Sequence, residues 1–580
     1  MPLRINTIRL STRGQVVELS HNLTVIVGPN NVGKSALLGQ ISRKLGEQPG
    51  MPEEPGALIA ELDLTKPTLD EIESRLTAIS PARPPGQYPQ GVFNEPTYLT
   101  RQGGTIFKSQ LSWLPEQLTG SIGALAQVFT SYLSPEMRLG QLGNTPPPDM
   151  YNNPQSSTPL QLLYQDRRLE ERIAELTTRA FGEAITVNRH GGSQIGLHMG
   201  RPTAPEPPLG EPTDYQPQLM ALPLASNQGH GVQAFLGMLM TLATHQYDVI
   251  LVDEPEAFLH PPQARLLGEL FVEFSKSGSQ VVVATHSDDF LQGVVGAAGS
   301  GADVTIAPLT RPEKTANAVA QVPPPAIRQL YEDPLLRFSN ILAGIFYKGV
   351  VLCESESDCR YYEAVLSHVL SSAEGSAYPD LLFTQCGGKD RFSKAVVALA
   401  GTRVPTAVVA DIDLMANEEK FRETFESMGG AYPSIEAQVK VLTANVNQKT
   451  VEPDSATARI KIEQALASIT STTVPTKTAN AIRDAVVRKS GWKQVKANGR
   501  SALSSGEPTQ AFDRILEACR KVGLFLVPVG ELERFHPEIS NANKQSWLRE
   551  VFETSAYENS PASQDFVRSI TEHIGASQRQ

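Results

Sequence analysis

The sequence predicts an α/β protein with two domains, each formed by strands and helices that alternate along the chain. Apolar runs with the length of buried strands recur in both halves, at residues 23–27, 249–252, 281–284, 350–353 and 407–410. With 580 residues the chain is too long for one hydrophobic core. We expect a first domain over residues 1–335, with an insertion at roughly 70–215 as a candidate dimerisation region. The second domain would cover residues 336–580, with a helical insertion at roughly 420–520.

The overall composition excludes several classes of protein. The net charge of −11 gives no general attraction to nucleic acid, so a DNA partner requires a local basic patch. The four cysteines show no C-x-x-C spacing that would indicate a zinc site or a disulfide framework: Cys353, Cys359, Cys386 and Cys519. No apolar run approaches the roughly 20 residues that span a bilayer, and the first residues lack the apolar segment of a signal peptide. We expect a cytoplasmic protein without a membrane partner.

A phosphate-binding loop follows the first buried strand. Residues 28–35 read G-P-N-N-V-G-K-S, which fits G-x-x-x-x-G-K-[ST], and residues 36–41 continue as a helix. Lysine and serine at the end of this motif reach the nucleotide phosphates and Mg²⁺, respectively. The alternative is a glycine-rich turn that only joins a strand to a helix. We expect ATP to contact Gly28, Asn30, Asn31, Gly33, Lys34 and Ser35.

Two acids follow the apolar strand at residues 249–252. Asp253 would hold Mg²⁺ with Ser35, and Glu254 would polarise the attacking water as a general base. Alone, such a pair is usually a solvated loop, but the upstream phosphate-binding loop favours a catalytic interpretation. The strand at residues 280–284 leads to His286, which is either a γ-phosphate sensor or an ordinary core histidine.

This order of motifs resembles the ATP-binding-cassette ATPases of the SMC type. Residues 226–233 are similar to a degenerate signature motif, although they depart from Leu-Ser-Gly-Gly-Gln, and residues 256–261 are similar to the D-loop. The resemblance implies that Ser226 and Gly229 cap the γ-phosphate of a nucleotide bound to the opposite subunit. We therefore expect a homodimer or a higher homo-oligomer. The glutamine of the family's Q-loop is not identifiable.

Smaller elements of the first half are also expected. Residues 3–27 contain two or three strands, and residues 57–64 alternate like a half-buried strand. Apolar residues at helical spacing predict one amphipathic helix over residues 162–180. Proline-rich loops interrupt this region and argue against a long coiled coil.

Carboxylates follow two strands of the second half. Glu354 and Asp358 come after residues 350–353, and Asp411 and Asp413 come after residues 407–410. The carboxyl ends of neighbouring parallel strands meet at one edge of a sheet, where open α/β folds bind ligands. Hard oxygen ligands suit Mg²⁺ or Mn²⁺. The alternative, a set of solvated loop acids, explains one cluster more easily than two.

The carboxylate pattern resembles the Toprim domain, although Ser355 stands where Toprim usually has glycine. Joined to an SMC-like ATPase, it resembles the OLD-family nucleases, including the nuclease subunits of Gabija-type phage defence. The resemblance implies that residues 385–389 form the glycine-rich loop after the second Toprim strand. It also implies further metal ligands at Glu531 and Glu533, after a strand near residue 525, and a lysine near the scissile phosphate. Lys496 is the first candidate for that lysine and Lys544 the second.

A local basic stripe lies in the second insertion. Residues 483–500 contain six basic side chains against one acid, Asp484. We expect a nucleic-acid groove here, and a solvated helix face is the alternative.

Together these features predict an ATP-regulated, divalent-metal-dependent DNA endonuclease or nickase in bacterial antiviral defence. Its cofactors would be ATP and Mg²⁺, with Mn²⁺ able to replace Mg²⁺ at the nuclease site, and a helicase could accompany it. One alternative is an SMC-like ATP-dependent DNA clamp in which the acids bind Mg²⁺ only structurally. Another is a topoisomerase-like strand-passage enzyme, but none of the 14 tyrosines lies in a recognisable nucleophile context. A transporter ATPase would not carry the second domain.

Overall fold

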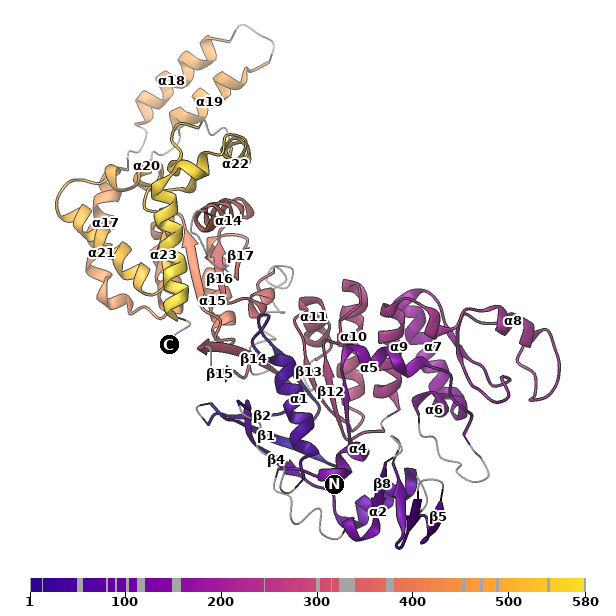
Figure 1. Ribbon diagram of the computed structural model, residues 1–580. Coiled ribbons are helices and arrows are strands. Elements are labelled where there is room, and N and C mark those ends of the chain that lie inside the picture. Colours follow the sequence, from indigo (N-terminus) through magenta and orange to yellow (C-terminus); the bar gives the residue numbers. More distant parts are fainter. Residues whose placement is uncertain are drawn as a thin grey trace. The chain divides into compact units, whose positions relative to one another are not determined.

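The computed structural model describes residues 2–12, 14–48, 56–79, 82–88, 91–100, 104–111, 120–148, 158–244, 246–298, 303–313, 316–322, 340–371, 380–450, 454–469, 473–486, 490–539 and 543–577. The chain divides into two compact units, Met1–Tyr331 and Glu332–Gln580, coloured along the sequence in Figure 1. Within the described ranges, no helix combines the length and the apolar character needed to cross a lipid bilayer.

The first unit is organised around a six-stranded sheet. Its strands lie in the order β15 (Ala316–Val319), β14 (Val304–Glu313), β3 (Leu23–Val27), β13 (Gln280–Ala284), β12 (Val249–Asp253) and β9 (Thr130–Leu133). All pairs are parallel except β14 with β15. Every residue of β3, β12 and β13 is buried, which explains why these strands read as continuous apolar runs. The strands predicted beside the ATP motifs are therefore confirmed.

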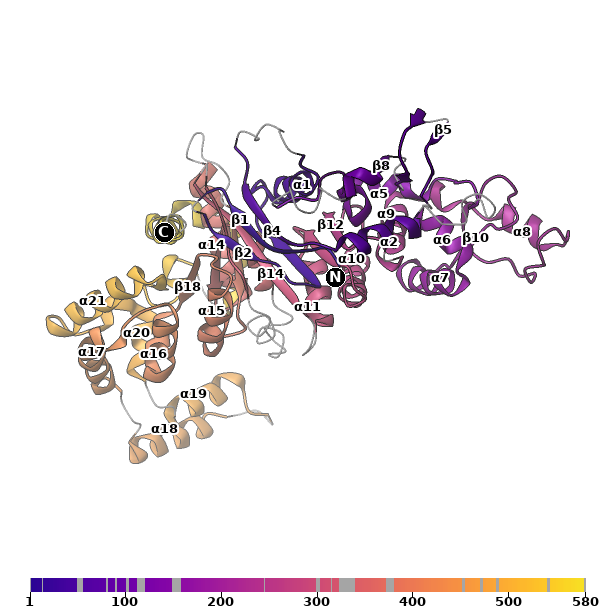
Figure 2. The ribbon, with the colours of Figure 1, turned by 90° about the horizontal axis from the view of Figure 1, so that it is seen from below.

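Helices and a second sheet surround these strands (Figures 1 and 2). The helices next to the motifs are α1 (Lys34–Leu45), α9 (His230–Ala243), α10 (Pro261–Ser275) and α11 (Asp288–Ala297). The second sheet is antiparallel, in the order β2 (Val16–Glu18), β1 (Arg4–Leu10) and β4 (Ile59–Thr65), and its apolar residues share a core with α1. The strands predicted over residues 3–27 and 57–64 are thus present.

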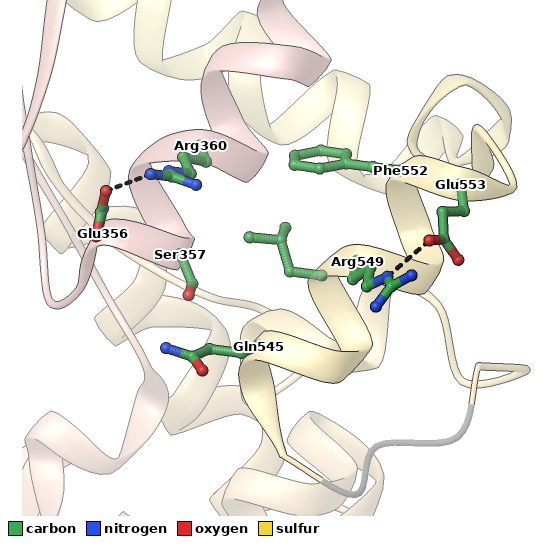
Figure 3. A pocket seen from close by; sticks show the side chains of 8 residues that line it. Glu356, Ser357, Arg360, Gln545, Arg549, Phe552 and Glu553 are labelled. Carbon is green, nitrogen blue, oxygen red and sulfur yellow. Dashed lines mark hydrogen bonds and ion pairs between the residues drawn. The ribbon is translucent and has the colours of Figure 1, made fainter.

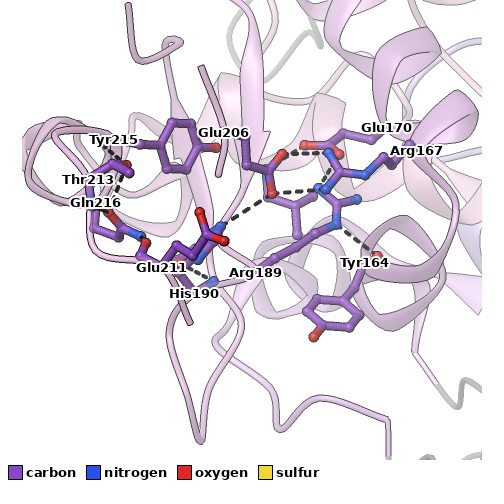
Figure 4. A network of polar contacts seen from close by, with 12 residues as sticks. Tyr164, Arg167, Glu170, Arg189, His190, Glu206, Glu211, Thr213, Tyr215 and Gln216 are labelled. Atoms are coloured by element: carbon purple, nitrogen blue, oxygen red, sulfur yellow. Dashed lines mark hydrogen bonds and ion pairs between the residues drawn. The ribbon is translucent and has the colours of Figure 1, made fainter. Parts of the chain in front are cut away.

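The segment between β4 and β12 consists of short elements. They are α2 (Leu69–Ile79), β5 (Gly86–Tyr88), β6 (Gly91–Phe93), β7 (Thr97–Leu99), β8 (Thr105–Phe107), α4 (Ala126–Phe129), α5 (Pro135–Leu139), α6 (Pro159–Gln165), α7 (Arg167–Phe181), β10 (Ile185–Val187), β11 (Leu197–Met199) and α8 (Tyr215–Ala221). Ion pairs connect α7 with the loops that follow it (Figure 4). Arg167 contacts Glu206, and the buried Arg189 contacts Glu170, each at 2.5 Å.

The prediction of one helix over residues 162–180 is wrong. The chain breaks at Asp166, which has a ψ angle of 100° and separates α6 from α7. The Asp166 carboxylate accepts hydrogen bonds from the backbone N–H groups of Arg168 and Leu169, so it caps α7. Aspartate is more favourable at such a cap than in a helix interior, and the apolar spacing alone did not reveal this.

The second unit contains a four-stranded parallel sheet. The strands lie in the order β17 (Leu381–Gln385), β16 (Gly349–Cys353), β18 (Thr406–Ala410) and β19 (Leu524–Leu526). The helices α14 (Glu356–Ser371), α15 (Phe392–Ala400), α22 (Lys544–Glu553) and α23 (Pro561–Ser577) accompany it. The strand predicted near residue 525 ends at Leu526, so the acids that follow it belong to a loop and the 3₁₀ turn Leu532–Phe535.

The predicted helical insertion lies between β18 and β19. It contains α16 (Glu418–Ser427), α17 (Glu436–Gln448), α18 (Ser455–Ala467), α19 (Thr476–Val486), α20 (Gly491–Asn498) and α21 (Glu507–Lys521). Figures 1 and 2 show α18 and α19 as a hairpin that stands out from the other helices of this unit. The basic stripe is not one helix face: it is divided between α19, α20 and the following turn, and Arg488 and Lys489 lie outside the described residues.

Candidate functional site

The phosphate-binding loop joins β3 to α1 and needs glycine at two positions. Gly28 and Gly33 have φ angles of 152° and 97°, and a Cβ atom on Gly28 would lie 2.3 Å from the carbonyl oxygen of Leu309. Gly33 precedes α1 without a side-chain cap, which leaves the first N–H groups of the helix available to a phosphate. The buried Lys34 donates hydrogen bonds to the carbonyls of Gly28 (2.8 Å) and Pro29 (2.9 Å).

The two predicted Mg²⁺ ligands of this site are in contact. The hydroxyl of Ser35 donates a hydrogen bond to Asp253 Oδ1 at 3.0 Å. Asp253 is the last residue of β12, and burial raises the pKa of its carboxyl. Burial disfavours the charged form of a carboxyl, and a nearby cation favours that form again. The hydroxyl of Ser35 and the carboxyl of Asp253 are both oxygen donors, which suit a hard cation such as Mg²⁺.

The predicted base and the predicted sensor also lie side by side. Glu254 has a φ angle of 46°, and its N–H donates to the carbonyl of Ala284 at the end of β13. His286 Nδ1 lies 3.5 Å from Glu254 Oε1. It lies closer, at 3.2 Å, to Oε1 of Glu256, which also accepts a hydrogen bond from the His286 N–H (3.0 Å). Glu256 is buried and holds His286 beside Glu254.

Arg138 is a component of the site that sequence reasoning missed. It belongs to α5, which follows β9, and its side chain is fully buried. The guanidinium donates to the carbonyl oxygens of Asp253 (3.1 Å) and Glu254 (2.9 Å). Burial lowers its pKa to about 10. The sequence offers little signal for this role, because Arg138 looks like a loop residue until β9 is placed beside β12.

The predicted signature segment has a defined structure of its own. Ser226 lies in the 3₁₀ turn Ala225–Asn227, and Gly229 directly precedes α9. The amide of Gln233 donates to the carbonyls of Ser226 (2.9 Å) and Gln228 (2.6 Å), which fixes the turn on the helix. In both views α9 and α1 lie on opposite sides of β12 (Figures 1 and 2).

The first glutamine after β9 is Gln141, and it accepts a hydrogen bond from Thr241.

A cluster of three carboxylates lies at the carboxyl edge of the sheet in the second unit. One oxygen each of Glu354, Asp411 and Asp413 lie within 4.8 Å of one another. Glu354 follows β16 and Asp411 follows β18, and these are neighbouring parallel strands. The N–H of Asp411 also donates to Glu354 Oε1 at 3.3 Å. The sequence-based expectation that these acids meet at one edge is thus met for three of the four.

Two lysines pair with acids of this cluster, and a third pairs with Asp358. Lys496 Nζ lies 2.8 Å from Asp411 Oδ2, and Lys389 Nζ lies 2.9 Å from Asp413 Oδ2. Lys544 Nζ lies 2.6 Å from Asp358 Oδ1. Lys389 comes from the glycine-rich loop after β17, and sequence reasoning gave it no role. Burial lowers the pKa of Lys496, but the neighbouring carboxylates raise it by more. The pKa therefore lies above its usual value, and this lysine stays charged.

The remaining acids that were predicted as ligands have other contacts. Asp358 Oδ2 accepts hydrogen bonds from the N–H (2.9 Å) and hydroxyl (2.8 Å) of Ser355, and Asp358 does not join the three-carboxylate group. Glu531 pairs with Arg534 at 3.3 Å. Burial and the neighbouring Glu533 raise the pKa of Glu531. Neither Glu531 nor Glu533 belongs to the three-carboxylate group of the described residues.

The carboxylate cluster fits a divalent cation. Burial, followed by the charges of Asp411 and Asp413, raises the pKa of Glu354 to about 7. Asp413 Oδ1 is buried and has no hydrogen-bond partner among the described residues. An oxygen without a partner in a group of like charges is costly unless a cation binds it. The donors are all carboxylate oxygens, which are the ligands that Mg²⁺ and Mn²⁺ prefer.

Part of the chain is similar in sequence to known proteins. Residues 222–291, which include β12, α10 and β13, match the family described as "AAA domain, putative AbiEii toxin, Type IV TA system". Over 177 residues the chain is 27% identical to the Old nuclease of Escherichia phage P2. The match covers 29% of this chain and spans 28% of the length of that relative.

Solved SMC heads are also similar to part of the chain. One, bound to the C-winged helix domain of ScpA, is 15% identical with a TM-score of 0.33, over 55% of this chain and 97% of that chain. The SMC head domain from Thermotoga maritima is 15% identical with a TM-score of 0.28, over 56% and 100%. At these scores the fold assignment rests on the sheet order and on the motifs. The sequence similarity to an Old nuclease confirms the OLD-family resemblance that the motifs predict.

Proposed function

We propose that this chain is an ATP-regulated, divalent-metal-dependent DNA endonuclease or nickase. The observation that carries the proposal is the convergence of Glu354, Asp411 and Asp413 beside Lys496, at the edge of a parallel sheet. The name of the phage P2 relative, a nuclease, supports the same activity. We assign the second unit to the Toprim type because its acids follow neighbouring strands in the order of that domain.

In the first unit we assign ATP hydrolysis to the residues around β12. Lys34 would leave the carbonyls of Gly28 and Pro29 for the β- and γ-phosphates. Glu254 would orient and deprotonate the attacking water, and His286 would contact the γ-phosphate. Arg138 fixes the carbonyls of Asp253 and Glu254, so it positions the base without touching substrate.

In the second unit the carboxylates would bind the ion and the lysines would bind DNA. A bound Mg²⁺ or Mn²⁺ supplies Lewis-acid stabilisation of charge on the phosphate. Lys496 lies close enough to Asp411 to donate a hydrogen bond to a phosphate bound there, and Lys389 and Lys544 flank the same region. Asp358, Glu531 and Glu533 are the proposed ligands of a second ion.

The proposed assembly is a homodimer or a higher homo-oligomer that shares its ATP sites. The separation of α9 from α1 across β12 supports this, because Ser226 and Gly229 would then face the nucleotide of another subunit. We propose DNA as the substrate, the cytoplasm as the location and antiviral defence as the setting, with a helicase as a candidate partner.

A DNA clamp without nuclease activity is the second candidate. The specific observation in its favour is that Lys496 and Lys389 already pair with Asp411 and Asp413, which neutralises part of the cluster without a metal ion. Supercoiled plasmid incubated with the full chain and Mg²⁺ or Mn²⁺ separates the two. Nicked or linear product supports the nuclease, and unchanged plasmid with retained DNA binding supports the clamp.

A further inference from the structure

A groove in the second unit lies next to the carboxylate cluster and has no part in the chemistry described above. It is formed by the first turns of α14 and by α22, and its volume is about 420 Å³ (Figure 3). That volume is in the range of sites that hold one small molecule, about 300–1,000 Å³. The groove combines an apolar side, Leu548 and Phe552, with a polar side. The polar side chains are Ser357, Gln545, two arginines (Arg360 and Arg549) and two glutamates (Glu356 and Glu553).

The groove lies next to the proposed nuclease site. Asp358 on α14 and Lys544 on α22 form an ion pair of 2.6 Å that joins the two helices. Ser357 and Gln545, the sequence neighbours of this pair, line the groove. On its other side the pair lies close to the cluster, because Asp358 accepts two hydrogen bonds from Ser355, the residue that follows Glu354. A DNA strand bound at the carboxylates therefore reaches the groove within a short length of backbone.

The two arginines of the groove are held only weakly. Arg360 pairs with Glu356 at 2.6 Å, and Arg549 pairs with Glu553 at 2.7 Å, each one turn away on its own helix (Figure 3). Exposed pairs of this spacing add little to stability, because water screens the two charges. A phosphate offers a bidentate, charge-assisted contact that is stronger than such a pair. Both guanidinium groups can therefore turn to a DNA backbone at little cost.

Phe552 adds a surface for a base. The residue is 36% exposed, and its ring makes an edge contact with Tyr557 at a centroid distance of 5.8 Å, which limits its orientation. Stacking of a base on an aromatic side chain is a main source of affinity for single-stranded nucleic acid, and it tolerates any base. Ser357 and Gln545 offer donors and acceptors for the edge of a base. The groove therefore offers arginines for a phosphate, an aromatic ring for the face of a base, and polar groups for the edge of that base.

We propose that the groove binds one unpaired nucleotide of the DNA strand next to the scissile phosphate. Its base stacks on Phe552, and the flanking phosphates contact Arg360 and Arg549. The position next to the cut rests on the nuclease function proposed above. An unpaired nucleotide at this place makes single-stranded or distorted DNA the preferred substrate.

Fluorescence tests the stacking directly. The full chain is mixed with short single-stranded oligonucleotides that carry a fluorescent adenine analogue at one position each, with Ca²⁺ in place of Mg²⁺. We expect the emission to fall at one or two adjacent positions, because stacking on an aromatic ring quenches the analogue. Phe552→Leu should abolish this fall, and Phe552→Trp should retain it. An equal fall with the Phe552→Leu protein overturns the proposal.

The salt dependence of oligonucleotide binding tests the arginines. Each phosphate contact on a single strand contributes about 0.7 to the slope of log K against log salt concentration. Arg360→Ala and Arg549→Ala should each lower the slope by about that amount. Arg568→Ala is the matched control, because Arg568 is an exposed arginine on α23 that pairs with Asp565 at 2.7 Å, and it should leave the slope unchanged. Unchanged slopes for both groove variants contradict the phosphate contacts.

Plasmid cleavage on the same preparations separates failure of the groove from failure of the nuclease. Cleavage that depends on Glu354, together with emission that does not depend on Phe552, overturns the groove alone. Emission that depends on Phe552 without any cleavage in Mg²⁺ or Mn²⁺ overturns the nuclease function and keeps the groove as a nucleotide site.

Discussion

Lys496 of the helical insertion lies 2.8 Å from Asp411 at the edge of the sheet, so the insertion contributes a side chain to the carboxylate cluster. The backbone of Lys496 packs closely against Gly530, and this contact sets the position of α20. Gly530 has a φ angle of 110°, and a Cβ atom on it would lie 2.1 Å from the carbonyl oxygen of Lys496. The carbonyl of Gly530 in turn accepts a hydrogen bond from Ile412, next to Asp411. Glycine at this point lets α20 approach the cluster.

Loss of the Lys496 ammonium should slow DNA cleavage more than it weakens DNA binding. One donor aimed at charge that develops in a transition state contributes about 10²–10³-fold to the rate. We expect Lys496→Met to lower single-turnover cleavage by about that factor while ATP hydrolysis is unchanged. Lys493→Ala is the control on the same helix, because Lys493 is exposed, and it should keep the rate at saturating DNA. A normal rate with Lys496→Met would remove Lys496 from the site.

The raised pKa of Glu354 predicts pH-dependent metal binding. Below about pH 7 the carboxyl holds a proton that a cation must displace. We therefore expect the Mn²⁺ affinity, measured by calorimetry, to rise as the pH increases through about 7, with proton release on binding. Glu354→Gln should bind Mn²⁺ more weakly and without that pH dependence. The same pH dependence in Glu354→Gln and the wild type would show that another group titrates.

The same shift has a consequence for stability without metal. The folded protein binds this proton more tightly than the unfolded chain, in which the pKa is near 4.5. The stabilising contribution is therefore complete below about pH 4.5 and is lost as the pH rises through about 7. Added Mn²⁺ should offset this loss in the wild type more than in Glu354→Gln.

The two acids after β12 predict separable defects in ATP turnover. Glu254→Gln keeps Asp253 and Ser35 for Mg²⁺ but removes the base, so ATP should bind normally and hydrolyse very slowly. Lys34→Ala removes the phosphate contact, so ATP binding itself should weaken. Nucleotide binding by filter assay and phosphate release measure the two steps. Wild-type turnover by Glu254→Gln is incompatible with the proposed base.

Removal of Arg138 should both destabilise the first unit and slow ATP hydrolysis. Arg138→Met leaves the buried carbonyl of Asp253 and the half-buried carbonyl of Glu254 without their donor, and an unpaired buried group costs about 1–3 kcal/mol. Urea unfolding measures that cost. If Arg138 positions Glu254, hydrolysis should fall at saturating ATP with little change in KM. A stability loss with normal turnover would make the role of Arg138 purely structural.

The sequence predicted those parts of the sites that follow a local pattern. Glu354 and Asp411 come directly after apolar strands, and parallel pairing of β16 with β18 then brings them together. Arg138 and Lys389 were missed because their roles depend on packing between elements far apart in the chain. The break at Asp166 was missed because apolar spacing continues across it, while the capping hydrogen bonds do not show in that pattern.

The central claim is that the carboxylate cluster, and not the ATP site, holds the groups that cleave DNA. Plasmid nicking and phosphate release, measured side by side on Glu354→Gln and Asp411→Asn proteins, test it most directly. Both substitutions keep the shape of the side chain and remove its charge, and catalysis by a positioned ion tolerates little displacement. We predict that nicking in Mg²⁺ or Mn²⁺ is abolished while ATP hydrolysis persists. Full nicking by both variants would contradict the nuclease assignment and leave the DNA clamp in its place.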